Sequence, residues 1–482
     1  MQKILKRVML LAAFGVFSVI AFQLVRISLV HADNGTKIIF TYLLMISSAV
    51  FAVWFAVKYK KGLFIKIFIL VFLPLIYQLI FSLNVRLLYE NDLNFNFISA
   101  VRFTENGFGS PLMYQAVFPG TATYPAFLML FMKIFGTGRM VPIALNHISV
   151  TCLCVMAYLF LRRKTGDAWA LGSGLFIALH PFIIIYSATC NAEIIFGTLI
   201  FSSFLSFVKS READSLPKRI RWIAVSAGLC GVSGIFRPLG IVFAVALLIY
   251  LFCCVREKPA VKLTSAAVFA AVLVLFGALN SLAVKEITKY DSPSGSYGWN
   301  LYVGASPTGR WNQKDADTFT AVINSAESPS QVQEYFARQA FERYREMGIL
   351  GAIRHGLRKF DSWFSARYMA DTASYQDPSS PFYSGDARGT YLTLITMVDL
   401  PVFIFSLFVC LWVLLRSAGG REDSLTVLVL YLLGSFILLM FLEIAFRYTV
   451  SYRIFFSLIS SAGLYEITNR RKSGFLNLRE NV

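Results

Sequence analysis

Twelve long apolar stretches occupy most of this 482-residue chain, and they restrict it to one class of fold. Most approach the ~20 residues that a helix needs to cross ~30 Å of hydrocarbon. The composition agrees, because 57% of the residues are apolar and only 15% are charged, which is atypical of soluble folds. We therefore predict an all-α polytopic membrane protein with about 12 transmembrane helices. The predicted spans are residues 8–30, 37–57, 63–84, 141–161, 168–186, 193–208, 220–236, 239–255, 263–284, 390–415, 424–444 and 452–467.

Basic side chains gather in alternate loops between these spans, as the positive-inside bias requires. The net charge of +18 therefore indicates anchoring beside anionic lipid head groups, and no nucleic-acid partner is expected. The same alternation bears on the apolar residues 122–136, because a crossing there would move every later basic cluster to the other side. We predict an interfacial or re-entrant helix for these residues. The predicted location is the cytoplasmic membrane.

Two polar segments, residues 85–140 and 285–388, face the extracytoplasmic side in this topology. The second is long enough for a small domain. Its apolar spacing over 328–347 predicts an amphipathic helix near the membrane, whereas 299–312 has the pattern of a strand followed by turns. The predicted domains are an N-terminal helix pair (1–62), a catalytic core (63–284), this extracytoplasmic domain (285–388), and C-terminal helices with a cytoplasmic tail (389–482).

Several short motifs occur in a characteristic order between residues 63 and 467. They are Glu90-Asn91-Asp92, Thr123-Tyr124-Pro125, Phe135-Gly136, Arg162-Arg163, His180-Pro181, Tyr186-Ser187, Glu193, Phe236-Arg237-Pro238-Leu239-Gly240 and Glu443-Ile444-Ala445-Phe446-Arg447-Tyr448. In this order the chain resembles the integral-membrane glycosyltransferases of the GT-C superfamily, particularly the branch with protein O-mannosyltransferases and the lipid A aminoarabinose transferase (glycosyltransferase family 39-like). One departure is Tyr124, which stands before Pro125 where the aminoarabinose transferases have a lysine.

The resemblance implies an inverting transfer of a sugar from a polyprenyl-phosphate donor to an acceptor hydroxyl at the outer face. The acceptor would be a glycolipid, a cell-wall polymer or a protein. Direct displacement needs a base that takes the proton of the acceptor hydroxyl. Asp92 best matches the acid that the family places in its first outer loop, and Glu90 and Glu193 are further catalytic candidates. The simpler reading of these three acids is solvated or interfacial side chains.

The leaving phosphate requires cations nearby. Arg237 and Arg447, at the outer ends of spans, and Arg102, beside the acidic loop, are candidate donor-phosphate ligands. Snorkelling to lipid phosphates is the alternative. Three aromatic residues could stack on sugar faces, although aromatic side chains are common at membrane interfaces anyway. They are Tyr124, Tyr448 and Trp299.

Some features leave alternatives open. Glu443 and Arg447 have the i,i+4 spacing of a helical ion pair. No metal site or cofactor is assigned, since the seven cysteines lie in apolar spans without ligand spacing, although a divalent metal is not excluded. Other functions compatible with many helices and a lipid-linked substrate are a lipid-linked sugar flippase or transporter and a polysaccharide polymerase or ligase. The chain lacks the half-to-half repeats typical of many transporters.

Overall fold

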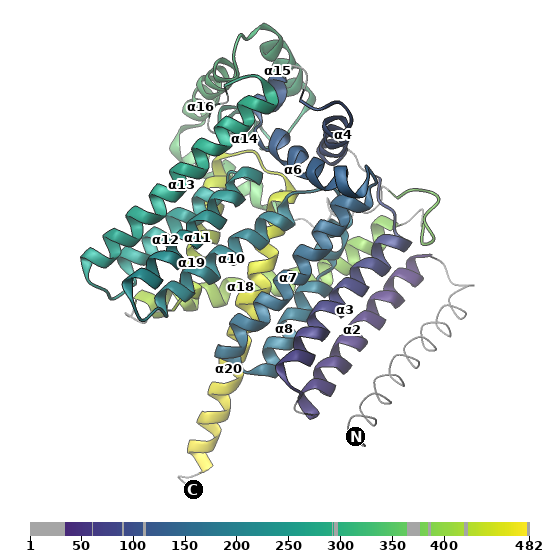
Figure 1. Ribbon diagram of the computed structural model, residues 1–482, viewed down its shortest axis with the longest axis vertical. Helices are drawn as coiled ribbons and strands as arrows, with labels where there is room; N and C mark the ends of the chain where they lie inside the picture. Colours follow the sequence, from purple (N-terminus) through teal and green to yellow (C-terminus); the bar gives the residue numbers. More distant parts are fainter. Residues whose placement is uncertain are drawn as a thin grey trace.

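The protein is an all-α, multi-pass membrane protein, as predicted. The computed structural model describes residues 34–59, 61–88, 91–108, 112–291, 293, 297–363, 376–383, 387–418 and 423–479. Within these residues the only strand-like pairing is an isolated antiparallel bridge between Leu87 and Gln376. Long helices form a bundle, and shorter helices lie across its upper end in Figure 1.

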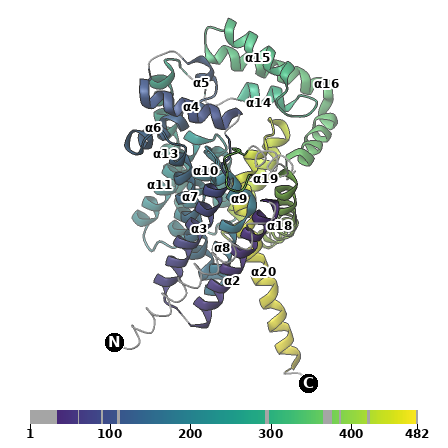
Figure 2. The same ribbon diagram turned by 90° about the vertical axis from the view of Figure 1, so that its right-hand side faces the viewer.

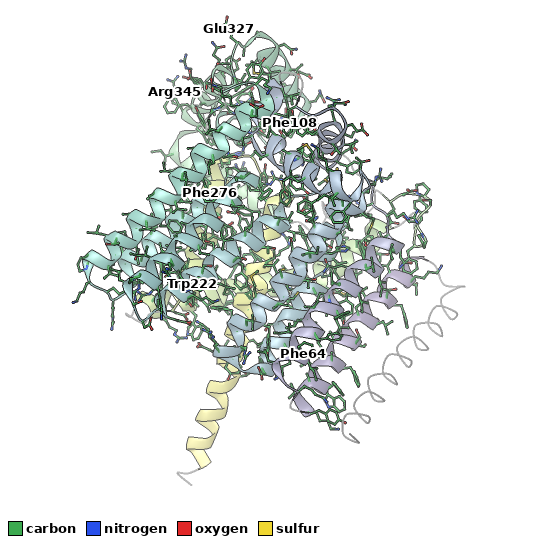
Figure 3. All side chains as sticks on the ribbon, in the orientation of Figure 1. Phe64, Phe108, Trp222, Phe276, Glu327 and Arg345 are labelled. Atoms are coloured by element: carbon green, nitrogen blue, oxygen red, sulfur yellow. The ribbon has the colours of Figure 1, made fainter. Side chains whose placement is uncertain are left out.

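Seven of the described helices are long and apolar enough to cross a membrane. They include α2 (Asn34–Lys58), α3 (Leu63–Asn84), α7 (Met140–Thr165), α10 (Glu193–Arg211), α11 (Leu216–Phe236), α13 (Pro259–Thr288) and α18 (Ala387–Ala418). Exposed apolar side chains such as Phe64, with 80% of its surface accessible, cover the sides of this bundle (Figure 3). Such side chains are compatible with hydrocarbon rather than water.

An eighth crossing forms if α8 (Asp167–Leu179) and α9 (Pro181–Ser187) count as one span bent by 53°. The bend follows from Pro181, which lacks an N–H group and disfavours helical backbone at the preceding residue. His180 accordingly has φ −64° and ψ 117°. The bend therefore lies within one predicted span, residues 168–186.

Three other predicted spans coincide with helices that are shorter or less apolar. They are α12 (Gly240–Cys253), α19 (Leu425–Phe441) and α20 (Val450–Arg479). α12 and α19 pack against each other within the bundle. The first predicted span, residues 8–30, lies outside the described residues, and every other predicted span coincides with a described helix or, at 168–186, with the bent pair α8 and α9.

The basic loops come together at one end of the bundle, which we call the basic end. Ion pairs connect these loops to one another. They join Arg163 to Glu212, Lys164 to Asp423, Arg211 and Arg219 to Glu257, Lys66 to Asp167, and Arg416 to Glu466. The loops that carry basic residues at alternate positions along the sequence thus lie together at one end of the structure.

Six of the described helices lie at the opposite end, in two groups. The first group is α4 (Asn91–Asn106), α5 (Met113–Val117) and α6 (Gly120–Phe135). The second group, which we call the cap, is α14 (Tyr297–Gly304), α15 (Gln313–Ser325) and α16 (Pro329–Trp363). α6 is the helix predicted over 122–136. Figure 2 shows both groups above the long helices.

The strand predicted at the start of 299–312 is wrong, because this segment begins in helix α14, whereas the turns predicted after it are present between α14 and α15. Trp299, Tyr302 and Val303 lie at helical spacing, and all three are buried in one cluster with Phe319 and Phe336. An i, i+3, i+4 pattern buries one helical face, whereas a strand would place Trp299 and Tyr302 on opposite sides. α15 then begins at Asn312, whose side-chain oxygen accepts a hydrogen bond from the Asp315 N–H.

The amphipathic helix predicted over 328–347 is confirmed as the first part of α16. Its apolar face, however, is buried in the cap. Val332, Phe336 and Ala340 belong to the same cluster as Trp299. Gly348, with φ 63° and ψ 170°, interrupts the helix, and a second helical part begins at Ile349. A positive φ of this kind is readily adopted only by glycine.

Candidate active site

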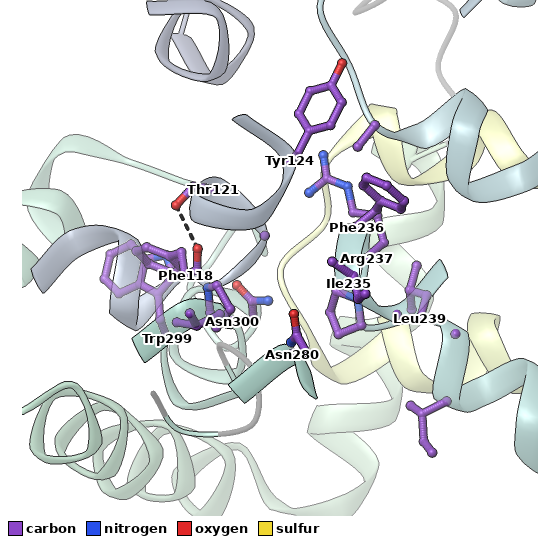
Figure 4. Close-up of a pocket in the computed structure, with 18 of the residues that line it drawn as sticks. Phe118, Thr121, Tyr124, Ile235, Phe236, Arg237, Leu239, Asn280, Trp299 and Asn300 are labelled. Atoms are coloured by element: carbon purple, nitrogen blue, oxygen red, sulfur yellow. Dashed lines mark hydrogen bonds between the residues drawn. The ribbon is translucent and has the colours of Figure 1, made fainter. Parts of the chain in front are cut away.

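A cavity of about 640 Å³ lies at the end of the bundle opposite the basic loops. Residues of α4 and α6 line one part of it, residues of the α11–α12 connection and α13 line another, and residues of the cap line a third. Figure 4 shows Tyr124 of α6, Arg237 of the α11–α12 connection, Asn280 of α13, and Trp299 and Asn300 of the cap around the cavity. Its charged lining residues are Asp92, Arg237, Glu443 and Arg447. Much of the remaining wall is apolar and comes from α11, α12 and α13.

Acids and arginines alternate along a chain of ion pairs beside this cavity. Arg447 Nη2 lies 2.5 Å from Asp92 Oδ2, and Arg447 Nε lies 4.0 Å from Glu193 Oε1. Glu193 also pairs with Arg237. The order is therefore Asp92, Arg447, Glu193, Arg237. Four residues that the sequence singled out from four separate regions are neighbours in the structure.

Local backbone structure sets the position of each of these four ion-paired residues. Glu193 occupies the first turn of α10, where the helix dipole favours an acid, and it is only 3% exposed. Arg237 follows the last residue of α11 in extended conformation, just before Pro238. Arg447 lies in the short 3-10 helix η1 (Phe446–Thr449). Asp92 lies in the first turn of α4.

Several polar atoms of these four ion-paired residues have no hydrogen-bond partner among the described residues. They are Glu193 Oε2, Arg237 Nε and Arg447 Nε. Buried charged groups normally satisfy all of their hydrogen-bonding capacity, because unpaired groups are costly. The unused atoms therefore leave capacity for a polar ligand.

Glu443 approaches the cavity from a different direction. The i,i+4 ion pair expected between Glu443 and Arg447 does not form, because the backbone is extended at Leu442 and Ala445. The cap holds this extended segment, since the Glu443 N–H donates to the Asn300 carbonyl at 2.6 Å. Burial raises the pKa of Glu443, and the nearby Arg447 acts in the opposite direction. Glu443 thus differs electrostatically from Asp92, which pairs directly with an arginine.

A buried lysine fixes the same segment. Lys359, on α16, is 3% exposed, and its ammonium donates to the carbonyls of Gly304 at 3.0 Å and Leu442 at 2.8 Å. Gly304 is necessary here, because a Cβ at this position would lie 2.3 Å from the Phe441 carbonyl oxygen. α14, α16 and the segment that precedes Glu443 are therefore in close contact.

Three aromatic residues were predicted to bind substrate, and all three line the cavity. Tyr448 lies beside both arginines, with its ring centre 5.4 Å from the Arg447 guanidinium and 6.0 Å from that of Arg237. Trp299 is 6% exposed and packs within the cap. Tyr124 is 1% exposed, and its hydroxyl donates to the Asn191 carbonyl at 2.8 Å. The side chains of Tyr124 and Trp299 thus form part of the cavity wall and do not project into the cavity.

One other predicted site residue, Arg102, is not brought to the cavity. Arg102 is exposed on α4 and is not a lining residue. Asp92, Asn96 and Phe103 lie on one side of this helix, whereas the 100° rotation per residue turns Arg102 away. Glu90 lies outside the described residues.

The structure adds lining residues that no motif indicated, among them Tyr114, Asn280 and Asn300. Asn280 and Asn300 project into the same space as Arg237 (Figure 4). Asn280 could have been found, because it is an amide within the apolar span predicted at 263–284, where polar residues are costly. No group of three or more His, Cys, Asp or Glu side chains among the described residues is placed to hold a metal ion.

A buried ion pair inside the bundle contacts η1. Arg453, at the start of α20, is 2% exposed and forms a bidentate pair with Asp399 of α18, with both N–O distances 2.7 Å. Its third nitrogen donates to the hydroxyl of Thr449, the last residue of η1. The guanidinium also lies 3.8 Å from the ring centre of Phe182 in α9. This pair therefore links α18, α20 and α9 to the segment that carries Arg447.

Part of the chain matches a known protein family. Residues 121–281 match the family described as dolichyl-phosphate-mannose-protein mannosyltransferase. No curated protein matches the chain. Among solved structures the chain is similar to ArnT from Cupriavidus metallidurans bound to undecaprenyl phosphate, with 12% identity, a TM-score of 0.36, and 83% of this chain and 77% of that chain covered. It is also similar to the Archaeoglobus fulgidus oligosaccharyltransferase in complex with Zn and sulfate, with 12% identity, a TM-score of 0.43, and 84% and 51% covered. The match over residues 121–281 agrees with the resemblance to GT-C glycosyltransferases that the order of motifs in the sequence indicated.

Proposed function

We propose that this protein moves a sugar from a polyprenyl-phosphate donor to an acceptor hydroxyl at the outer face of the cytoplasmic membrane, with inversion at the anomeric carbon. The observation that carries the proposal is one cavity that combines two arginines, carboxylates and an apolar wall. A lipid-linked sugar phosphate needs these three environments together. The outer face follows from the basic loops, which lie at the other end of the bundle and belong in the cytoplasm.

The arginines suit a phosphate ligand. Arg447 and Arg237 present planar, multiply donating groups that favour phosphate oxygens. Without a ligand, Asp92 and Glu193 neutralise them. The prenyl chain would lie against the apolar wall, where Leu273, Phe276 and Ile241 line the cavity. The neighbouring surface of α13 is open to lipid, because Val274 and Leu282 are 72% and 63% exposed.

Asp92 is the proposed base. As the acceptor oxygen attacks the anomeric carbon, Asp92 takes its proton, the bond from that carbon to the phosphate oxygen breaks, and polyprenyl phosphate leaves. Arg447 and Arg237 stabilise the negative charge that develops on the leaving phosphate. Glu193, which contacts both arginines, positions them rather than accepting the proton.

The Asp92–Arg447 pair couples the two halves of this reaction. A donor phosphate that binds Arg447 competes with the Asp92 carboxylate for the same guanidinium nitrogens. Asp92 would then be released toward the acceptor only when the donor is bound. Asp92→Asn should consequently bind the donor at least as tightly as the wild type, because the competing negative charge is removed.

The decisive experiment is sugar transfer from a panel of radiolabelled polyprenyl-phosphate sugars in membranes that contain the wild type, Asp92→Asn or Glu193→Gln. Asp92→Asn should lose turnover and keep donor binding, whereas Glu193→Gln should weaken donor binding as well. Asp317→Asn is the matched control, because Asp317 is an exposed acid of the cap away from the cavity lining. Unchanged turnover in Asp92→Asn would refute the assignment of the base. Lipid movement across the bilayer by the Asp92→Asn protein would favour a flippase.

A further inference from the structure

The second part of α16, residues 349–359, has an apolar face that nothing in the described structure covers. Ile349, Leu350, Ile353 and Leu357 are 83%, 80%, 41% and 57% exposed. At 100° per residue these four side chains fall within a sector of about 100° on one side of the helix. They form a contiguous stripe, which a water-exposed helix would not normally carry.

The other faces of this helix differ from the stripe. Ala352, Gly356 and Lys359 point inward and are buried against the bundle and the rest of the cap. Arg354 and Arg358, one helical turn apart, are exposed and lie along one edge of the apolar stripe. An apolar stripe bordered by arginines is the arrangement of helices that lie in a membrane interface.

The position of the helix fits the same interpretation. Gly356 packs so closely on α19 that a Cβ would lie 2.9 Å from the Met440 side chain, one residue before the end of that apolar helix. Figure 2 shows α16 running from beside α15 down toward α19. Residues 349–359 therefore lie where an apolar helix of the bundle ends, which is the depth at which hydrocarbon gives way to head groups.

We propose that residues 349–359 seat the cap on the membrane surface and bind anionic phospholipid head groups. The apolar stripe enters the interface, and Arg354 and Arg358 contact lipid phosphates. The partner is a lipid surface and not another protein, because the basic pair borders the stripe at the level where phosphates are found. This surface is separate from the cavity and does not depend on which donor or acceptor the enzyme uses.

The inner face of the same helix connects this proposed membrane-contact surface to the cavity wall. Lys359 bonds the Gly304 and Leu442 carbonyls, and His355 Nε2 lies 2.9 Å from the Gly304 carbonyl oxygen. Leu442 immediately precedes Glu443 in the cavity wall. The membrane contact thus holds the cap and the Glu443 segment in a fixed relation to the bilayer.

Site-specific photo-crosslinking tests the proposal. The full chain carries p-benzoylphenylalanine in place of Leu350, or in place of Tyr335 as the control, and is reconstituted in nanodiscs of phosphatidylcholine with phosphatidylglycerol. Tyr335 is 41% exposed on the first part of the same helix. Mass spectrometry should show a phospholipid adduct at position 350 and none at position 335. Absence of a lipid adduct at 350, or a cross-link to a second protein chain, would overturn the proposal.

The role of the arginines has its own test. In the wild-type background, the adducts at position 350 should contain several-fold more phosphatidylglycerol than its share of the bilayer. Arg354→Gln combined with Arg358→Gln should bring that share back to the bulk value while the adducts themselves persist. Arg338→Gln, which removes an exposed arginine from the first part of α16, should leave the enrichment unchanged. Enrichment that survives the double substitution would refute head-group binding by these arginines. Neither readout requires sugar transfer, so a failure of the proposed activity remains distinguishable.

Discussion

Replacing Arg453 by methionine should be among the most destabilising single substitutions in the bundle. The guanidinium is 2% exposed and makes two 2.7 Å contacts with Asp399 and a further bond to Thr449. Methionine has a similar length but provides none of these donors. The substitution leaves the Asp399 carboxylate, which is 8% exposed, without its arginine partner inside the bundle.

The size of the effect follows from what remains unpaired. Removal of one partner of a buried ion pair costs about 3–5 kcal/mol, whereas replacement of both partners by apolar residues of similar volume is often neutral or stabilising by about 1–4 kcal/mol. Loss of the bond to Thr449 costs roughly 1 kcal/mol in either case. Arg453→Met should therefore lower the free energy of unfolding by about 5 kcal/mol. Asp399→Leu combined with Arg453→Met should return close to the wild type.

The assay is reversible unfolding in mixed micelles, with the two single substitutions and the double substitution forming a thermodynamic cycle. Thr449→Val adds a control that removes the hydroxyl and leaves the ion pair intact. It should cost roughly 1 kcal/mol, and Thr449→Ser should restore most of it. A double variant as unstable as Arg453→Met, or a single variant within about 1 kcal/mol of the wild type, would refute the reasoning.

Three further predictions concern the cap and the cavity wall. Gly304→Ala should destabilise the protein by about 1–3 kcal/mol or more and lower sugar transfer, because its Cβ would lie 2.3 Å from a backbone oxygen, whereas Gly62→Ala, with nothing within 4 Å, should leave both unchanged. Burial lowers the pKa of Lys359 from 10.5 to about 7, so the unfolded chain binds more protons between these values, and the free energy of unfolding should rise from pH 7 toward pH 10 in the wild type but less in Lys359→Met. Tyr124→Phe should lower the melting temperature through loss of the bond to Asn191, with the KM for the donor unchanged; a raised KM would instead indicate a direct substrate contact.

The helices could largely be predicted from the sequence, because a span is a local property of about 20 residues. α3 has the bounds of its predicted span, and α7 and α13 contain theirs and extend up to four residues beyond them. Helix lengths were predicted less well where a helix packs against other helices rather than against lipid. α12 and α19 pack on each other inside the bundle, so their length is not set by bilayer thickness alone. Their apolar runs look like full crossings in the sequence, but the helices are 14 and 17 residues long.

The cap shows why short aromatic segments mislead. Residues 299–304 are rich in aromatic and branched side chains, which favour a strand by intrinsic preference. The partners that decide the matter, Phe319 and Phe336, come later in the chain and pack on one face of a helix. The amphipathic pattern over 328–347 was read correctly as a helix, because it repeats over several turns. What its apolar face would contact could not be read, since the same pattern suits a membrane surface and a small protein core.

The candidate site was partly accessible from the sequence for a physical reason. Asp92, Glu193, Arg237 and Arg447 are charged residues at the ends of apolar runs, where a charge is costly unless it has a role or a partner. The pairing between them is a tertiary property and could not be derived. Glu443 and Arg447 have helical spacing, yet an extended backbone separates them, and Arg447 pairs with an acid more than 350 residues away instead. Arg453 and Asp399 are likewise charged residues inside predicted spans, where a charge is costly without a partner.

The alternating charges also explain how such a cavity persists without its ligand. Two arginines that face an apolar wall would repel each other and remain unpaired, and a buried unpaired charge is unstable. Asp92 and Glu193 remove this cost by standing beside and between the guanidinium groups. In the proposed function, a donor phosphate that enters would replace part of that neutralisation, so donor binding would be an exchange of anions and not a simple addition. Asp92, the proposed base, would then be the same group that stabilises the empty site. Its partner Arg447 lies in η1, which is bonded through Thr449 to the buried Arg453.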